Sequence, residues 1–282
     1  MIQPKLINHR FLEEYPSGST VNYLDRHFYI MGDDASEIML LNEEMQEVER
    51  VSLLAKGETM RTPKATKADI EASLIVDYEN EAVILFFGSG SLTPHRDSAF
   101  LFNPNTKQIT QINYTAFYNQ LRMEVAHLNI EAATLVNNHF LLGIRANNSS
   151  PYNTIAVASS DIFLPVFKHK IQIKLPLNLP VGISGMDYDF KTDRLFMTFS
   201  SEDTSNALDD GQVGDSYLAM VENAAQKLLN TELSLDFMVN LTDLDAVFTA
   251  QKIEGVSLIA SNRLILVADD DLGNTRIFTM SL

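Results

Sequence analysis

Residues 69–74 read Asp-Ile-Glu-Ala-Ser-Leu, and a related hexapeptide returns at three later points in the chain. The later copies are Asn-Ile-Glu-Ala-Ala-Thr at 129–134, Gly-Ile-Ser-Gly-Met-Asp at 182–187 and Lys-Ile-Glu-Gly-Val-Ser at 252–257. The third residues of these copies are 60, 53 and 70 positions apart, and a shorter copy, Ser-Gly-Ser-Thr, stands at 17–20. One motif that recurs at such intervals indicates a chain built from structural repeats.

Each motif precedes a strand-like segment that ends in polar residues. Apolar and β-branched residues occur in short runs separated by Gly, Asn, Asp, Ser and Pro, which is typical of strands and turns. The polar ends of the segments that follow the five motifs lie at 32–34, 88–89, 145–147, 200–202 and 269–271. Five such units match the four-stranded blades of a β-propeller. The sequence therefore predicts an all-β, five-bladed β-propeller, with six blades, a β-sandwich or a single large barrel as the alternatives.

The two ends of the chain are expected to meet in one blade. After the last motif there is room for about three strands, so the fourth strand of that blade must come from elsewhere. We predict that the amino terminus, around Leu6 to Phe11, supplies it and closes the ring. The result is one domain over 1–282, with short helical insertions near 114–123 and 221–229, where apolar residues follow a helical period.

Composition excludes several classes of protein. There is no Cys, so disulfides, thiolate metal sites and a cysteine nucleophile are excluded. The 37 Asp and Glu against 21 Lys and Arg give a formal net charge of −16, which argues against nucleic-acid and anionic-membrane partners. No signal peptide and no apolar run long enough for a membrane span are visible, so we expect a soluble, cytoplasmic protein. P-loop, dinucleotide-binding, Gly-x-Ser-x-Gly and zinc-peptidase motifs are also absent.

Several short motifs resemble a known group of proteins. They are Ile-Glu-Gly-Val at 253–256 with Val-Ala-Asp-Asp-Asp at 267–271, Asn-Ile-Glu-Ala at 129–132 with Arg145 and Asn147, and Gly-Ser-Gly-Ser at 88–91 with Arg96. From Asp69 onward the chain resembles uncharacterised bacterial β-propellers, which are similar to phytase-like propellers and to those with "esterase-like activity of phytase". The resemblance implies a propeller fold and, through its more distant members, a hydrolase. The chain departs from the pattern at Ala72 and Ala132, where glycine is usual, and at Ser184, where an acid is usual.

The predicted fold gathers polar residues at one mouth of its central channel. In a propeller the innermost strands begin, and the second strands end, around this mouth, and the loops there supply binding groups. Acids at equivalent positions of three blades therefore converge near the axis, and like charges that converge need a cation, a basic partner or raised pKa values. The candidate ligand-binding residues at the mouth are Glu71, Glu131, Glu254, Arg145, Arg96, Ser89, Ser91, Asn147 and Lys252.

A Ca²⁺ or Mg²⁺ ion is one ligand that such a ring could hold, because hard cations prefer oxygen ligands. The candidate metal ligands are Glu71, Glu131, Glu254 and Asp269. The alternative is structural, with the acids accepting hydrogen bonds from backbone N–H groups of the neighbouring blade. Two further acidic stretches, 269–271 and 202–215, are more typical of a turn and of a solvated loop than of calcium sites.

Three functions stay open at this point. The first is a propeller that binds a small molecule, an ion or a protein at its channel mouth without catalysis. The second is a calcium-dependent hydrolase of phosphate or carboxylic esters of the phytase-like type, in which Arg96, Arg145 and His95 would hold the anion. The third is a pure interaction scaffold.

Overall fold

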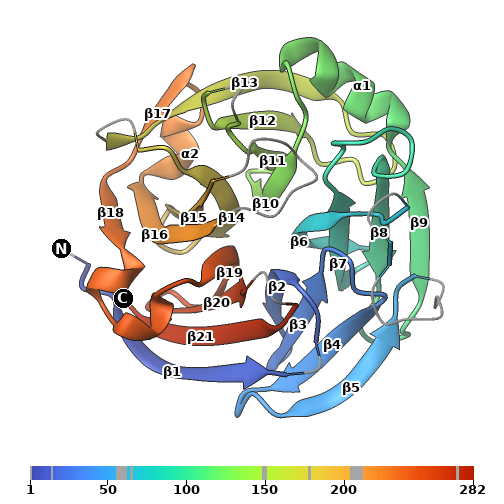
Figure 1. Ribbon diagram of the computed structural model, residues 1–282. Coiled ribbons are helices and arrows are strands. Elements are labelled where there is room, and N and C mark those ends of the chain that lie inside the picture. Colours follow the sequence, from blue (N-terminus) through green and yellow to red (C-terminus); the bar gives the residue numbers. More distant parts are fainter. Residues whose placement is uncertain are drawn as a thin grey trace.

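The computed structural model describes residues 2–13, 15–54, 62–63, 66–147, 151–176, 179–203, 212–270 and 273–282. Its strands form five sheets that stand around a central axis as the blades of a propeller (Figure 1). The predicted all-β, five-bladed fold is therefore confirmed, and the alternatives of a sandwich, a single barrel and six blades are excluded.

Each blade contains four strands that pair antiparallel, and the first of them lies nearest the central axis (Figure 1). The first blade contains β2 (Gly18–Leu24), β3 (His27–Gly32), β4 (Glu37–Asn42) and β5 (Glu47–Ser52). The second contains β6 (Ile70–Tyr78), β7 (Glu81–Gly88), β8 (Ser98–Phe102) and β9 (Ile109–Asn113). The third contains β10 (Ile130–Val136), β11 (His139–Ile144), β12 (Thr154–Ser159), β13 (Phe167–Lys174) and, in parallel, β17 (Glu232–Ser234). The fourth contains β14 (Gly182–Asp189), β15 (Arg194–Asp203), β16 (Gln212–Glu222) and β18 (Phe237–Asn240), and the fifth β19 (Lys252–Ala260), β20 (Arg263–Asp269), β21 (Thr275–Ser281) and β1 (Lys5–Leu12).

The middle strands are apolar on both faces, because each blade is covered by a neighbouring blade on either side. In β7, Phe86 and Phe87 are both fully buried, although successive side chains of a strand point to opposite faces. Phe86 belongs to the hydrophobic core shared with the first blade, and Phe87 to the core shared with the third. The short continuous apolar runs of the sequence are therefore strands buried on both faces.

Helices occur where the sequence places insertions, but the second is much shorter than expected. α1 (Thr115–Glu124) connects the second blade to the third and buries three side chains of one face. α2 (Ala224–Lys227) has a single turn, because the chain remains in β16 as far as Glu222. Two short 3-10 helices, η2 (Leu241–Asp243) and η3 (Ala246–Phe248), lead from β18 to β19. Within the described part of the chain, no helix has the length and apolar character that a membrane crossing requires.

The ring closes by pairing the two ends of the chain. β1 pairs with β21 from Lys5 to Leu12, as predicted, and the two termini lie near each other in Figure 1. At the start of β21 the buried Thr275 hydroxyl donates to Tyr15 O at 2.9 Å and accepts from Gly18 N at 2.8 Å. This hydroxyl therefore connects the fifth blade to the segment that leads into the first blade.

Thr275→Val removes this connection with little change in side-chain shape. The buried Gly18 N–H and Tyr15 C=O would each lose a partner, so we expect the free energy of unfolding to fall by about 1–3 kcal/mol. Urea unfolding followed by circular dichroism measures the change. Thr279→Val in the same strand is the matched control, because Thr279 is also buried and its hydroxyl makes no hydrogen bond to another described residue. Equal stability of the two variants would contradict the proposed role of Thr275.

Candidate functional site

Every blade begins its innermost strand with the same irregularity. In β2, β6, β10, β14 and β19 one residue near the start is skipped when the strand pairs with its neighbour, which makes a β-bulge. Bulges of this kind redirect a side chain and are common next to functional sites. The skipped residues are Ser19, Glu71, Glu131, Ser184 and Glu254. The three carboxylates that the sequence places near the axis thus share one structural position, and all three line the central channel.

The residue after each bulge is small, because the inner strands of neighbouring blades almost touch there. The five residues at this position are Thr20, Ala72, Ala132, Gly185 and Gly255. A Cβ atom on Gly185 would lie only 2.9 Å from the Cα atom of Gly255 in the next blade. The free volume of the channel at this level is about 10 Å³, roughly what one water molecule needs. A larger ligand could therefore bind only at the mouth.

Glu131 is held by donors from its own blade. Arg145 Nη1 lies 2.7 Å from one carboxylate oxygen, and Asn129 Nδ2 lies 2.5 Å from the other. The same guanidinium reaches the fourth blade, where it donates to Ser200 Oγ at 3.0 Å and to Ser200 O at 3.1 Å. Gly182 leaves the space for this side chain, since a Cβ there would lie 2.3 Å from Arg145 Cγ. Arg145 thus neutralises Glu131 and connects two blades.

Glu254 is neutralised within its own strand. Lys252 Nζ lies 2.8 Å from a Glu254 carboxylate oxygen, and both side chains are largely buried. Asp269, at the end of β20, stands opposite Lys252 in the sheet. Asn147 lies just beyond the end of β11 and is exposed. These predicted residues therefore lie at the channel mouth, on the third and fifth blades.

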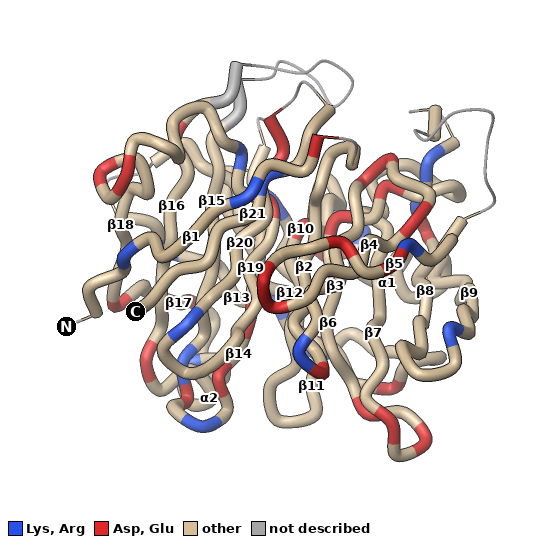
Figure 2. The backbone as a smooth tube through the Cα atoms, turned by 90° about the horizontal axis from the view of Figure 1, so that it is seen from below, with Lys and Arg blue, Asp and Glu red and all other residues tan. Residues whose placement is uncertain are grey.

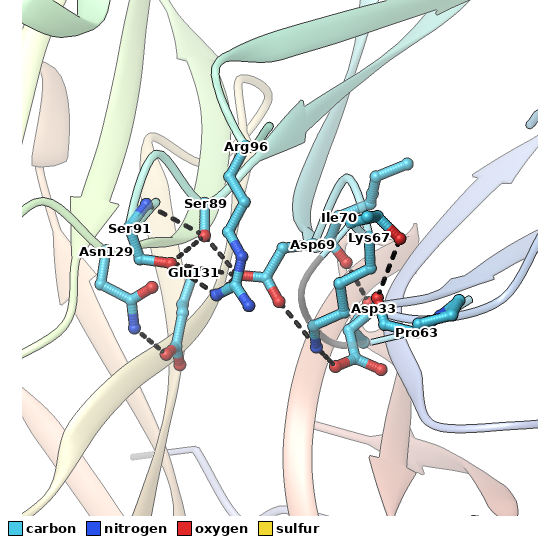
Figure 3. A network of polar contacts seen from close by, with 12 residues as sticks. Asp33, Pro63, Lys67, Asp69, Ile70, Ser89, Ser91, Arg96, Asn129 and Glu131 are labelled. Carbon is cyan, nitrogen blue, oxygen red and sulfur yellow. Dashed lines mark hydrogen bonds and ion pairs between the residues drawn. The ribbon is translucent and has the colours of Figure 1, made fainter. Parts of the chain in front are cut away.

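Glu71 lies in a different environment, a group of three carboxylates around one lysine. One oxygen each of Asp33, Asp69 and Glu71 lies within 4.8 Å of the others. The Lys67 ammonium group forms ion pairs with Asp33 and, at 2.7 Å, with Asp69 (Figure 3). Asp33 Oδ1 is buried without a hydrogen-bond partner, and no donor among the described residues reaches the Glu71 carboxyl. These four residues are termed the Lys67 cluster below.

Asp69 is also bound from the side of the second blade (Figure 3). Arg96 Nη1 lies 2.5 Å from Asp69 Oδ2 and 2.7 Å from Ser91 Oγ, and the buried Ser89 hydroxyl donates to the same carboxylate. The predicted residues Arg96, Ser89 and Ser91 therefore lie close together, and they surround the carboxylate of Asp69. Two cations, Lys67 and Arg96, face the three carboxylates of the cluster, so one negative charge is left over among the described residues.

The surplus charge belongs to Glu71. Burial raises the pKa of Glu71 well above its ordinary value, and the negative charges of Asp33 and Asp69 raise it further, while Lys67 opposes them. Burial would lower the pKa of Lys67, but the carboxylates of Asp33, Asp69 and Glu71 raise it above its ordinary value. Lys67 therefore stays charged, and the Glu71 carboxyl takes up a proton more readily than an exposed glutamate.

Sequence reasoning missed Lys67 and the central position of Asp69. The signal that could have found them is their closeness to Glu71 in the sequence, since Lys67, Asp69 and Glu71 are two residues apart. His95, predicted beside Arg96 as an anion ligand, lines a separate cavity instead. Of the acidic stretches, Asp271 and residues 204–211 lie outside the described residues.

The four predicted metal ligands do not converge on one ion in this arrangement. Glu131 and Glu254 are paired with cationic side chains, and within the described ranges the acids that approach closely enough for one ion are Asp33, Asp69 and Glu71. There the Lys67 ammonium group already supplies positive charge, and a divalent cation would have to displace it. Calcium binding at Glu71, Glu131, Glu254 and Asp269 stays a prediction.

The sequence matches the "Family of unknown function (DUF6929)" over residues 14–282. The chain belongs to this family. Among solved structures it is similar to the glutaminyl cyclase of Myxococcus xanthus, with a TM-score of 0.58 and 12% identity over 99% of this chain and 96% of that chain. It is also similar to the tail fibre of Staphylococcus aureus phage P68, with a TM-score of 0.51 and 10% identity. That match covers 100% of this chain but 53% of the tail fibre, so the chain spans about half of it.

No curated protein matches the sequence. At identities of 10–12%, similarity to solved structures shows the fold alone. The propeller fold implied by the resemblance in the sequence is therefore confirmed, while a phytase-like activity is not shown by the family or by these structures.

Glu71→Gln tests the state of this carboxyl through the pH dependence of stability. An acid whose pKa is higher in the folded than in the unfolded protein makes the folded state less stable as the pH rises. The loss of stability begins near the ordinary pKa of 4.5 and is complete above the pKa of the folded state. The variant lacks this penalty, so it should be more stable than the natural protein near pH 8, and the difference should vanish near pH 4. Denaturant titrations of both proteins at the two pH values measure it. A natural protein that is the more stable one near pH 8 would contradict the expectation.

Proposed function

We propose that the chain is a binding propeller that holds a small ligand at its channel mouth through a positively charged group seated on Glu71. The observation that carries the proposal is the surplus negative charge of the Lys67 cluster, on a carboxyl that lines the channel and receives no hydrogen bond from the described residues. An ammonium or guanidinium group would supply both the charge and the missing donors. Asp33 Oδ1 offers a second acceptor close by.

The size and charge of the ligand are bounded by the same geometry. The channel below the mouth has room for about one water molecule, so the rest of the ligand extends outward. A surplus of one negative charge suits a single cationic group better than a divalent ion, which prefers several oxygen ligands of higher total charge. Glu131 and Glu254 already have cationic partners, which makes Glu71 the carboxyl that selects the ligand.

A thermal-shift titration with small amines tests this proposal. Ethanolamine, putrescine and arginine at low ionic strength should raise the melting temperature of the natural protein, because a ligand that binds only the folded state stabilises it. Glu71→Gln should lose the ligand-induced shift. Glu44→Gln is the matched control, since Glu44 is exposed in the turn between β4 and β5, away from the channel. No shift with any amine, or a shift that Glu71→Gln retains, would refute the proposal.

The calcium-dependent ester hydrolase is supported by one feature of the site. The close approach of Asp33, Asp69 and Glu71 offers three carboxylate oxygens to a cation, provided that Lys67 moves away. The arginines expected to hold the anion, however, are engaged by Asp69 and Glu131. The glutaminyl cyclase of the same fold is an enzyme, but a shared fold does not transfer an activity.

Removal of the Lys67 charge distinguishes the two functions. The natural protein should show no calcium-induced thermal shift up to about 5 mM and no phosphate release from phytate. Lys67→Met leaves the three carboxylates without their ammonium partner, so calcium should stabilise this variant. Lys168→Met, on the exposed side of β13, is the matched control and should not respond. A calcium shift in the natural protein that Glu71→Gln abolishes would favour the metal-dependent hydrolase.

A further inference from the structure

Another acid lies between the inner strands, farther from the mouth than the bulges. Asp187 stands three residues after the bulge of β14, and the residues at this position in the other blades are Asn22, Leu74, Thr134 and Ser257. Four of the five side chains are polar and can form hydrogen bonds between blades. The structure describes every residue of the five inner strands that build this level.

The Asp187 carboxylate connects three blades. One oxygen accepts from Leu258 N at 2.7 Å and from Ser257 Oγ at 3.2 Å, both in the fifth blade. The other accepts from Tyr188 N at 2.8 Å and, at 3.5 Å, from the Thr134 hydroxyl of the third blade. A carboxylate has about four acceptor sites, so these four donors occupy all of them. The carboxyl therefore holds inner strands together and has no need of a ligand.

Hydrogen bonds at the same level continue into the first and second blades. The Ser257 hydroxyl also accepts from Tyr23 N at 3.1 Å, and Asn22 Nδ2 donates to Ser73 Oγ at 2.5 Å. Leu74 ends the series, because its apolar side chain donates no hydrogen bond to the third blade. The series thus runs from the third blade through the fourth, fifth and first to the second, and its charged member is the acid of the fourth blade.

This acid has no cationic partner. Within the described ranges, no Lys, Arg or His side chain forms an ion pair with Asp187. The charged groups on the strands packed against β14 lie either nearer the mouth or at the turns of the opposite end, where both signs occur (Figure 2). Nearer the mouth are Glu71, Glu131, Lys252 and Glu254, and at the turns are Asp77, His139, Asp189 and Arg194.

The groups at the turns are exposed or bound elsewhere. Asp77 and His139 are exposed. Asp189 accepts from the Thr192 hydroxyl at 2.6 Å, and Arg194 pairs with Glu222 at 3.2 Å. None of them compensates the charge of Asp187, so burial decides its state.

Burial raises the pKa of Asp187 from its ordinary 3.8 to about 6, although the four hydrogen bonds oppose the rise. The folded chain therefore favours the neutral acid. The contribution to stability is fully present below pH 3.8 and is lost as the pH rises through 6. Asp187 is only partly buried, so solvent protons reach it.

We propose that Asp187 is a pH-sensitive contact between the third, fourth and fifth blades, which tightens when the acid takes up a proton and loosens when it ionises. A neutral carboxyl still accepts hydrogen bonds and can also donate one, whereas the charged form loses hydration between the strands. The proposal is independent of the ligand at the mouth, because Glu71 takes no part in these contacts.

An NMR titration of the full-length protein, labelled with ¹³C at the Asp carboxyl carbons, tests the proposal. One carboxyl signal, which Asp187→Asn lacks, should titrate with a midpoint near pH 6. The Leu258 and Tyr188 amide protons should shift with the same midpoint, because both donate to this carboxylate. Thr134→Val removes a donor to the charged form, so the midpoint should rise. Thr279→Val, also buried, is the matched control and should leave it unchanged.

Denaturant unfolding shows whether this titration acts on the fold. Glu71→Gln is the background, so that the two carboxyls are separated. Adding Asp187→Asn should favour the folded state more at pH 8 than at pH 5, and the ratio of the two unfolding equilibrium constants should change about tenfold between these pH values. Asp77→Asn, at an exposed position of the inner strand β6, is the matched control and should leave the ratio constant.

Three results would overturn the proposal: an Asp187 signal that titrates below pH 5, a midpoint that Thr134→Val does not move, or equal responses of Asp187→Asn and Asp77→Asn. If Asp187→Asn does not fold, Thr134→Val still identifies the signal, since it should move the midpoint of Asp187 alone. None of these results bears on amine binding at the mouth, so the two proposals fail separately.

Discussion

Five strands that converge on one axis set the constraint on which the rest of this protein depends. Where the inner strands come closest, only small side chains fit, and a single Cβ on Gly185 would collide with Gly255 of the next blade. The bulge just before this point places one side chain of every blade in front of the crowded level. The same crowding leaves a free volume of about 10 Å³ in the channel, so a ligand larger than a water molecule does not fit at this level.

The charges at the mouth follow from this arrangement. Three of the five bulge residues are glutamates, and each one is compensated differently. Glu131 has an arginine that also reaches the next blade, and Glu254 has the lysine two residues before it in the same strand. Burial raises the pKa of Glu71, and the charges of Asp33 and Asp69, with which it shares a single lysine, raise it further. One bulge position therefore yields two neutral pairs and one carboxyl with a raised pKa.

Much of this arrangement could be predicted from the sequence because the repeat carries it. The four hexapeptides and the shorter copy at 17–20 predicted the first strand of each blade, and the apparent departures at Ala72 and Ala132 obey the same rule of a small residue after the bulge. The lack of strands after the last motif predicted the pairing of β1 with β21. Lys67 was missed, because it lies outside the repeated motif and acts only on the second blade and its neighbour.

The sequence by itself determined the repeated all-β units, the closure of the ring and the three glutamates at equivalent positions, because apolar strands and polar strand ends recur along the chain. It favoured five blades, and the structure excluded six. Only the tertiary structure decided which cation serves which carboxylate. That choice depends on side chains of different blades, such as Lys67 between Asp33 and Asp69 or Arg145 reaching Ser200, whose separations in space no spacing along the chain encodes. The surplus charge at Glu71 is a consequence of that choice.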